Sequence, residues 1–311
     1  MTQTLHSLLK AVLLPVPAGL SNPGVTSITC DSRSVGQGCL FIGLPGERVD
    51  GGCFWQEALK AGAAAALIGE QAAASHPPSE QDPVLVIPEP VSHWAGELAA
   101  AFWQHPSLRM QLIGVTGTNG KTTTTTLLYN LFMLLGHKSG LLSTVNIKIG
   151  KETRPATHTT PDPVYLNQNL KAMVDQGVKY CFMEASSHGI HQERTAGLKF
   201  AGAVFTNISH DHIDYHGSFD NYILAKKKLF DELPKTAFAL TNADDRHGYT
   251  MVQHTKAAVH DFALRTEADY KAKILEHQLN GMLLKLGHHE VWSKLIGNFN
   301  AYNLVAIYGV A

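Results

Sequence analysis

The sequence predicts an α/β fold, with a small N-terminal α/β domain followed by a central domain whose mainly parallel sheet is flanked by helices. Three observations support this prediction. Short apolar segments with the length of buried strands alternate with segments in which apolar residues have helical spacing. A glycine-rich turn joins one such strand to one such helix at residues 114–123. Polar clusters follow several of the predicted strands, and ligands bind at that edge of open α/β sheets.

The first domain is assigned to residues 1–88. Apolar residues near the N-terminus follow the spacing of a short helix, and a second helix is expected from about residue 54. The strands of this domain are expected at 25–29, 39–44, 63–68 and 84–87. A helix over 91–104, which a His-Pro pair ends, opens the second domain, 89–311.

The second domain continues the alternation of strands and helices. In chain order we expect strand 112–115, a helix through residue 135, strand 139–144, hairpin 146–155, helix 164–176, strand 180–183, strand 201–206, helix 221–230 and strand 237–241. Residues 255–295 are predicted to be rich in β-structure. A last helical pattern starts at residue 296 and is still in progress at residue 311, so a further C-terminal portion is expected.

Composition excludes several classes of function. The chain has 311 residues, of which 44% are hydrophobic and 16% charged, and its formal net charge of -1 argues against nucleic acid as the main partner. None of the four cysteines forms a C-x-x-C pair, so neither a zinc ribbon nor a disulfide framework is indicated, and a reducing cytoplasm is expected. The N-terminal apolar run lacks a basic leader, and no apolar run is long enough to span a bilayer, so no membrane association is expected.

The segment Gly117–Thr123 has the features of a phosphate-binding loop. Its glycines let backbone N–H groups approach phosphate oxygens, and the N-terminus of the following helix adds partial positive charge. Lys121 can reach the outer phosphates, and the hydroxyl group of Thr122 can bind a magnesium ion. The first glycine lies at position 114, one residue earlier than the usual spacing places it. The alternative is an ordinary glycine-rich turn, which the Lys-Thr pair makes the weaker interpretation.

Other candidate groups follow neighbouring strands, so they are expected to face one crevice together with the loop. Glu184 is either a second oxygen ligand for magnesium or a solvated carboxylate at a strand end. The cluster Asp211-His212-x-Asp214-x-His216 has the composition of a transition-metal site. Beside a phosphate loop, a second magnesium or manganese site is favoured over structural zinc. The lysines at 226–228 have, by themselves, the pattern of a solvated helix face.

Five stretches, which span nearly the whole chain, carry a resemblance to a known family. They are Asp31-Ser32-Arg33 through Asp50-Gly51, Gly117-Thr118-Asn119-Gly120-Lys121-Thr122-Thr123, Glu184-x-Ser186-Ser187-His188-Gly189, Asp211-His212-x-Asp214-Tyr215-His216-Gly217, and Gly297-x-Phe299-Asn300-x-x-Asn303. On these residues the chain resembles the Mur ligases, the ATP-dependent amide-forming enzymes of peptidoglycan precursor synthesis. The fourth stretch favours the ligases that add a diamino acid. The resemblance implies a role in cell wall biogenesis, and thereby in cell shape and cell division.

The resemblance also implies catalytic and cofactor-binding residues. ATP, the cosubstrate, is expected to contact Gly117, Thr118, Asn119, Gly120, Lys121, Thr122, Thr123 and, at its adenine, Asn300. The implied catalytic residues are Lys121, Glu184, His212 and Lys226. Two Mg²⁺ ions are implied, with Mn²⁺ as an alternative; Thr122 and Glu184 bind one, and Glu184, His212 and Lys226 the other. Lys226 is implied to be N-carboxylated by CO2, since an ammonium group cannot bind a cation whereas a carbamate can.

The second substrate implied by the resemblance is the nucleotide sugar UDP-MurNAc-L-Ala-D-Glu. Its uridine side is expected to contact Ser32, Glu47, Arg48 and Val49. Its muramoyl-dipeptide is expected to contact His158, Thr159, Thr160, Ser186, Gln192 and Arg194. The guanidinium group of Arg194 suits a carboxylate or a pyrophosphate.

The implied reaction begins with attack of the D-Glu carboxylate on the γ-phosphate of ATP, which gives an acyl phosphate. The amine of a diamino acid, with meso-diaminopimelate favoured over L-lysine, then displaces phosphate. Mur ligases have a C-terminal domain that binds this amino acid, and it is not found in this sequence, so little or no turnover is expected from the chain alone. A monomer is expected. The alternatives are a ligase that adds D-Ala-D-Ala and a truncated, non-catalytic nucleotide-binding module.

Overall fold

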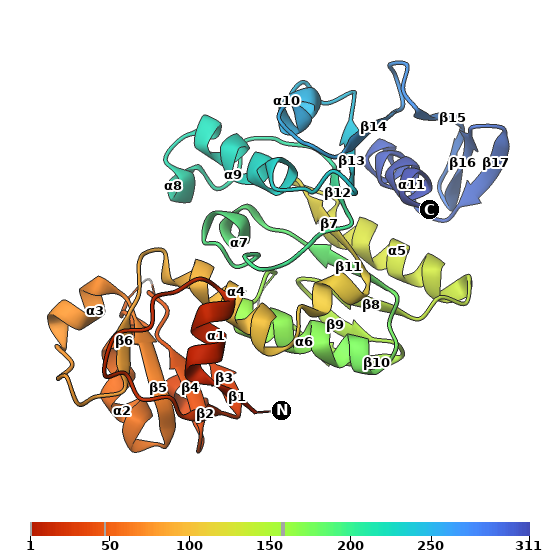
Figure 1. Cartoon of the computed structure of the whole chain (residues 1–311). Helices are drawn as coiled ribbons and strands as arrows, with labels where there is room; N and C mark the ends of the chain where they lie inside the picture. The colour runs from red at the N-terminus through yellow and green to blue at the C-terminus, as the bar shows by residue number, and fades with distance from the viewer. Residues whose placement is uncertain (1, 47, 157–158) are drawn as a thin grey trace. The chain divides into compact units, whose positions relative to one another are not determined.

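The computed structural model describes residues 2–46, 48–156 and 159–311. The chain divides into two compact units (Figure 1). The first comprises Met1–Leu108, Pro161–Ala172 and Gln192–Leu198, and the second comprises Arg109–Thr160, Met173–His191 and Lys199–Ala311. Among the helices of the described ranges, none combines the length and the apolar character that crossing a membrane requires.

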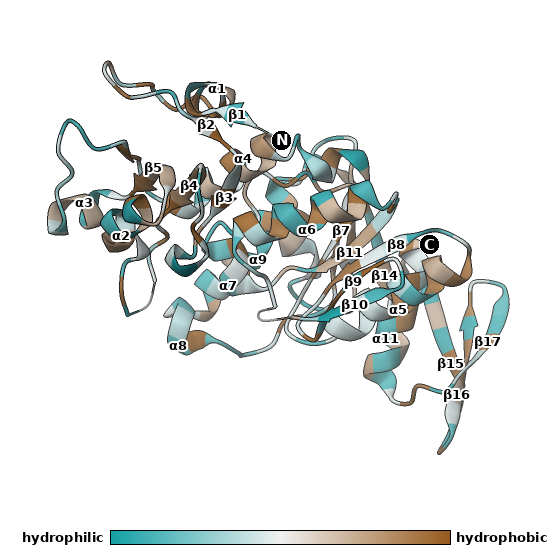
Figure 2. Cartoon of the chain, turned by 90° about the horizontal axis from the view of Figure 1, so that it is seen from below, coloured by the Kyte–Doolittle hydropathy of each residue, from teal (hydrophilic) through white to brown (hydrophobic). Residues whose placement is uncertain are grey.

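The first unit is built on a parallel sheet with the strand order β3-β4-β5-β6. Its elements are β1 (Gln3–Thr4), α1 (Leu5–Ala11), β2 (Gly24–Val25), β3 (Ser27–Thr29), β4 (Cys39–Ile42), α2 (Trp55–Lys60), β5 (Ala63–Ile68), α3 (Glu70–Ser75), β6 (Val84–Val86) and α4 (Val91–Phe102). Strand β4 is buried along its whole length, and Figure 2 shows β4 and β5 coloured as hydrophobic. Strands buried on both faces are typical of parallel sheets covered by helices.

Helix α4 packs as part of the first compact unit. The sequence prediction placed this helix in the second domain, after a boundary near residue 88. In the structure, its apolar side chains Val91, Ala95 and Leu98 join the same buried cluster as Leu5 and Leu8 of α1. The helix therefore completes the core of the first unit, which extends to Leu108.

The second unit is built on one large mixed sheet. Its strands are β7 (Gln111–Thr116), β8 (Ser139–Leu142), β9 (Asn146–Ile149), β10 (Glu152–Pro155), β11 (Tyr180–Glu184), β12 (Gly202–Phe205), β13 (Phe238–Asn242), β14 (Ala258–Ala263), β15 (Tyr270–Gln278), β16 (Gly281–Leu286) and β17 (His289–Ser293). Its helices are α5 (Lys121–Leu134), α7 (Ser187–His191), α8 (Ile213–His216), α9 (Phe219–Asp231), α10 (Gly248–Val252) and α11 (Asn298–Val310). Helix α6 (Pro163–Asp175) starts among residues of the first unit and ends among those of the second.

Strand order fixes where a ligand can bind in the second unit. The order is β10-β9-β8-β11-β7-β12-β13-β14-β15-β16-β17, and the strands from β8 to β15 in this order run parallel to one another. After β7 the chain continues to β8, which lies on one side of β7 in the sheet. After β12 it continues to β13, which lies on the other side of β7. Ligands of open α/β sheets bind at such a switch point, at the carboxyl ends of the strands.

Side-chain alternation along β7 assigns helices to the two faces of this sheet. Ile113 and Val115 lie in one buried cluster with residues of α5 and α11. Gly114, between them, points to the opposite face, where a Cβ atom would lie 3.0 Å from Phe200 and 3.4 Å from Leu229 of α9. Helices α5 and α11 therefore cover one face and α9 covers the other (Figure 1).

The structure confirms the predicted fold class. The main strands and helices lie within a few residues of their expected positions, and β14 to β17 account for the predicted β-rich segment. The sequence prediction missed the short helices α3, α7, α8 and α10, which have four to six residues each. Segments this short do not show a full helical period of apolar residues.

Candidate active site

The loop between β7 and α5 needs glycine at two positions. Gly117 and Gly120 have φ angles of +149° and +87°. A Cβ atom would lie 2.0 Å from Oγ1 of Thr206 at Gly117, and 2.4 Å from Oδ1 of Asn303 at Gly120. Both the backbone conformation and the neighbouring side chains therefore exclude larger residues. Gly120 is also the N-cap of α5, so the N-terminus of this helix opens onto the loop.

The side chain of Lys121 closes over the loop. Its Nζ atom donates hydrogen bonds of 2.9 Å each to the carbonyl groups of Gly117 and Thr118. Burial lowers the pKa of Lys121, while the charges of Glu184 and Asp211 act in the opposite direction. The structure thus holds this amine within the loop.

Glu184, at the carboxyl end of β11, is fully buried. Its Oε2 atom accepts hydrogen bonds from the hydroxyl groups of Thr122 at 2.9 Å and of Thr144 at 3.1 Å, and its Oε1 atom accepts one from the amide of Thr144 at 2.8 Å. The alternative of a solvated strand-end carboxylate is therefore wrong. Thr144, which follows β8, was not singled out from the sequence.

Two of the three lysines on α9 contradict the expectation of a solvated helix face. Lys226 is 1% exposed, and its Nζ atom donates a 2.9 Å hydrogen bond to the carbonyl of Gly117. Burial is the main reason why its pKa lies well below the usual value, and the nearby charge of Lys121 lowers it further. Lys227 is 5% exposed because its amine turns to Asp231 and His254. The side chain of Lys228 remains 35% exposed.

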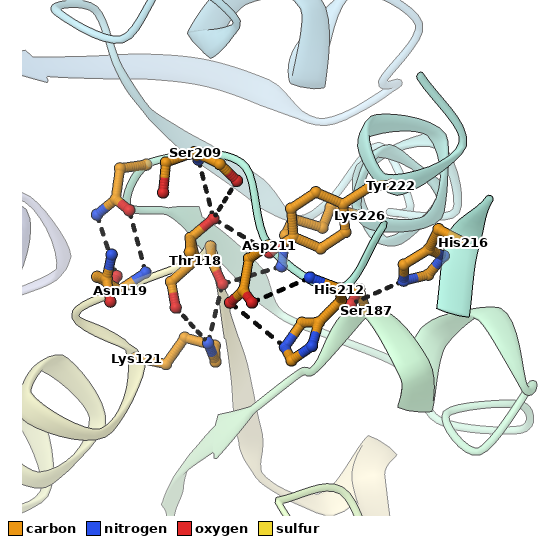
Figure 3. A network of polar contacts seen from close by, with 12 residues as sticks. Thr118, Asn119, Lys121, Ser187, Ser209, Asp211, His212, His216, Tyr222 and Lys226 are labelled. Atoms are coloured by element: carbon orange, nitrogen blue, oxygen red, sulfur yellow. Dashed lines mark hydrogen bonds and ion pairs between the residues drawn. The ribbon is translucent and has the colours of Figure 1, made fainter. Parts of the chain in front are cut away.

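His212 lies in the loop between β12 and α8, in a left-handed conformation with a φ angle of +53°. Its backbone amide donates to Oδ1 of Asp211 at 3.0 Å, and its Nε2 atom lies 3.5 Å from Oδ2 of the same carboxylate. Figure 3 shows this pair beside Thr118, Lys121 and Lys226. Within the described part of the chain, no three His, Cys, Asp or Glu side chains are grouped as a metal site.

Residues expected at the muramoyl-dipeptide extend the contacts around Glu184. The hydroxyl group of Thr160 donates to the backbone carbonyl of Glu184 at 3.1 Å. The same hydroxyl oxygen lies 3.0 Å from the hydroxyl oxygen of Ser186. The Oγ1 atom of Thr159 lies 3.2 Å from that of Thr144. Thr159, Thr160 and Ser186 thus lie around Glu184: Thr160 contacts its backbone carbonyl, Ser186 contacts Thr160, and Thr159 contacts Thr144, which donates to its carboxylate.

The other expected substrate contacts lie in the first unit or outside the described residues. Ser32 begins a short 3-10 turn that Asp31 caps, while Arg48 and Val49 are exposed. Arg194 donates a hydrogen bond to Oε1 of Gln192 at 2.5 Å. Glu47 and His158, two further expected contacts, lie outside the residues that the structure describes.

Helix α11 connects the expected adenine contact to the loop. Asn300 donates from Nδ2 to the carbonyl of Ile296 at 2.9 Å and accepts from Asn303 at 3.3 Å. Asn303 in turn accepts from the hydroxyl group of Thr124 at 3.4 Å and lies against Gly120. The terminal asparagine pair is therefore part of the loop's support.

Sequence reasoning also missed two supports of the loop. Asn207, which follows β12, accepts hydrogen bonds from the amides of Thr118 at 2.8 Å and Asn119 at 3.0 Å. Tyr222 of α9 lies with its hydroxyl group 3.1 Å from Oγ1 of Thr118. Asn207 could have been found by its place at a strand end, whereas nothing in a helical tyrosine marks it as a loop contact.

Comparison with known proteins agrees with this geometry. The Mur ligase middle domain matches residues 115–311, and the Mur ligase family catalytic domain matches residues 24–103. The chain belongs to the Mur ligase family. Its middle-domain match contains the loop, Glu184, His212 and Lys226.

Individual Mur ligases are similar over nearly the whole chain. The UDP-N-acetylmuramoyl-L-alanyl-D-glutamate–2,6-diaminopimelate ligase of Synechococcus sp. (strain WH7803) is 50% identical, over 99% of this chain and 63% of the relative. The ligase of the same name from Phocaeicola vulgatus is 45% identical, over 99% and 63%. The chain thus spans less than two thirds of the length of these curated relatives.

Solved structures of Mur ligases share the fold. A UDP-N-acetylmuramoyl-L-alanyl-D-glutamate–2,6-diaminopimelate ligase superposes with a TM-score of 0.83 at 29% identity, covering 100% of this chain and 63% of that one. MurF ligase from Thermotoga maritima in complex with ADP gives a TM-score of 0.63 at 20% identity, covering 95% and 64%. The latter likeness concerns the fold alone.

Proposed function

We propose that this chain carries the ATP-binding and nucleotide-sugar-binding parts of a ligase that joins meso-diaminopimelate to UDP-MurNAc-L-Ala-D-Glu. The similar proteins that bear the name of this reaction support the substrate class. The observation that carries the proposal is the single network around the loop, in which Lys121, Thr122, Glu184 and Lys226 all contact the loop or each other. Its parts are those that phosphoryl transfer from ATP requires.

The donor set around Glu184 fits magnesium. The buried Glu184 carboxylate and the Thr122 hydroxyl are oxygen donors, which Mg²⁺ prefers, and they lie at the start of the helix that follows the loop. We assign them to one ion. Bound there, magnesium supplies positive charge that offsets the negative charge of the phosphates.

A second ion, Mg²⁺ or Mn²⁺, is assigned to Glu184, His212 and Lys226. The amine of Lys226 cannot bind a cation, so this assignment requires its carboxylation by CO2. Its deep burial beside the Gly117 carbonyl places its side chain next to the phosphate-binding loop, which supports such a role.

Each of these residues has a separate role in the proposed reaction. The loop amides and Lys121 hold the β- and γ-phosphates, while Asn300 contacts the adenine. A carboxylate oxygen of D-Glu attacks the γ-phosphorus, the bond to the bridging oxygen breaks, and ADP leaves. The amine of the diamino acid attacks the acyl carbon, phosphate leaves with the electron pair of the broken C–O bond, and the nitrogen releases a proton to solvent. Positive charge from Lys121 stabilises the negative charge that develops at the phosphoryl group.

We assign the uridine contacts to Ser32, Arg48 and Val49 and the muramoyl-dipeptide contacts to Thr159, Thr160, Ser186, Gln192 and Arg194. Glu47 and His158 complete the proposed set. The reaction is assigned to a monomer in the cytoplasm, where nucleotide-sugar precursors are made.

Calorimetric titration with ATP, with and without Mg²⁺, tests this function. We expect binding that depends on Mg²⁺ and is lost in the Lys121→Met variant. Lys138→Met is the matched control, because Lys138 is exposed and precedes β8 at the opposite edge of the sheet. Equal ATP affinity of all three proteins would contradict the proposal.

A further inference from the structure

Tyr222 of α9 lies against the loop, Lys226 and two histidine rings of the candidate site, although no role has been assigned to Tyr222 itself. Its side chain is fully buried. Its hydroxyl oxygen lies 3.1 Å from Oγ1 of Thr118 in the loop, and the Nζ atom of Lys226 lies 4.5 Å from the centre of its ring. The rings of His212 and His216 lie 6.1 Å and 5.3 Å away, centre to centre. Figure 3 shows the ring beside Lys226 and next to Thr118 of the loop.

Hydrogen-bond accounting at Thr118 makes Tyr222 the donor. Oγ1 of Thr118 accepts from the amide of Ser209 at 3.0 Å and donates its single proton to the carbonyl of Ser209 at 3.3 Å. The remaining contact of this oxygen, with Tyr222, must then use the phenol proton. The hydroxyl group of Tyr222 thus fixes the rotamer of a residue whose backbone amide and carbonyl belong to the loop.

The ring of Tyr222 restricts the amine of Lys226 in a different way. A lysine ammonium has three N–H donors, and the carbonyl of Gly117 accepts one of them. The face of the aromatic ring, whose centre lies 4.5 Å from the nitrogen, occupies a second side and limits where the nitrogen can move. Tyr222 and Lys226 are also four residues apart on one helix, so the ring and the lysine stem lie on the same face of α9. The amine is thereby held in one place.

We propose that Tyr222 is a positioning residue that acts through two separate groups: its hydroxyl group orders the phosphate-binding loop through Thr118, and its ring holds Lys226 at the position where that lysine is modified and used. This inference rests on the proposed function, since the role of Lys226 does. The two groups can be removed one at a time. Tyr222→Phe removes the hydroxyl group and keeps the ring, and Tyr222→Leu removes both.

The experiment measures ATP affinity by calorimetry in Mg²⁺ and carboxylation of Lys226 by ¹³C NMR in ¹³C-bicarbonate. Lys226→Arg identifies the carbamate signal. Tyr222→Phe is expected to weaken ATP binding about fivefold, the effect of one hydrogen bond, and to keep the carbamate signal. Tyr222→Leu is expected to weaken ATP binding at least as much and to lose most of the signal. Because phenylalanine also restores the buried volume that leucine lacks, a leucine variant of a second buried tyrosine is needed to separate the role of the ring from a general loss of stability.

Tyr129 provides the matched control. It is 6% exposed in the same unit, and its hydroxyl group donates to the carbonyl of Gly150 rather than to the loop. Tyr129→Phe and Tyr129→Leu are expected to keep both ATP affinity and the carbamate signal. If Tyr222→Leu does not fold, Tyr222→Met fills a similar volume without an aromatic face and replaces it.

Each result decides one of the two ideas. An unchanged carbamate signal in Tyr222→Leu, or an equal loss in Tyr129→Leu, overturns the role of the ring. Unchanged ATP affinity in Tyr222→Phe overturns the role of the hydroxyl group. A wild-type chain that binds ATP but gives no carbamate signal refutes the lysine chemistry of the proposed function, and with it the role of the ring, whereas the role of the hydroxyl group is still decided by ATP affinity.

Discussion

The Thr122→Val variant tests how the loop and Glu184 depend on each other. Valine has nearly the shape of threonine, so the substitution removes little except the 2.9 Å hydrogen bond from Oγ1 of Thr122 to the fully buried Glu184 carboxylate. A hydrogen bond to a charged group contributes roughly 1.5–3 kcal/mol. We therefore expect the free energy of unfolding to fall by about 2 kcal/mol, a change of about 30-fold in the ratio of folded to unfolded protein.

Thr144→Val separates this stability effect from ATP binding. It removes the 3.1 Å hydrogen bond from Oγ1 of Thr144 to the same carboxylate, while the backbone amide of residue 144 still donates at 2.8 Å. Both variants are expected to lose stability in equilibrium urea unfolding followed by circular dichroism. Only Thr122→Val is expected to lose the Mg²⁺ dependence of ATP binding, measured by calorimetry. The reasoning is refuted if Thr122→Val keeps the stability and the Mg²⁺-dependent ATP affinity of the wild type.

Two further variants test the loop and a strand-end carboxylate. Gly120→Ala places a Cβ atom against Asn303 at a φ angle of +87°, so it should lose ATP binding and about 1–2 kcal/mol of stability, whereas Gly36→Ala, in open space, should be neutral in the same assays. Burial opposes ionisation of Asp244, but hydrogen bonds led by the amide of Thr266 lower its pKa overall, so its stabilising contribution is present above the ordinary aspartate pKa and is lost as the pH falls below it. Asp244→Asn should therefore show a smaller loss of stability than the wild type between pH 5 and pH 3 (about one unit either side of the ordinary aspartate pKa), and an equal loss in urea unfolding would contradict this.

Much of the fold could be predicted because local patterns and tertiary packing agree in it. The apolar run before Gly117 and the helical pattern after it correspond to β7 and α5. The packing partner of α4 could not be predicted in the same way, because the sequence of α4 shows an apolar face but not the element against which it packs. Its partner, α1, lies about 80 residues earlier in the chain, and only the folded core reveals the pair.

The site was predictable where a residue follows a strand or belongs to a motif, as Lys121, Thr122 and Glu184 do. Burial was not predictable for Lys226 and Lys227, since a run of lysines on a helix is usually solvated. Tyr222 is a common kind of residue at a common spacing, so its two contacts appear only when α9 is placed against the loop.

Calorimetric titration of the chain with UDP-MurNAc-L-Ala-D-Glu, compared with the corresponding UDP-MurNAc-tripeptide, tests the central claim most directly. The account predicts that the dipeptide form binds more tightly, because the substrate of a diamino-acid ligase lacks the third residue. Tighter binding of the tripeptide form would indicate instead a ligase that adds D-Ala-D-Ala. Binding of neither form, in a chain that still binds ATP, would contradict the proposed nucleotide-sugar site and leave a nucleotide-binding module.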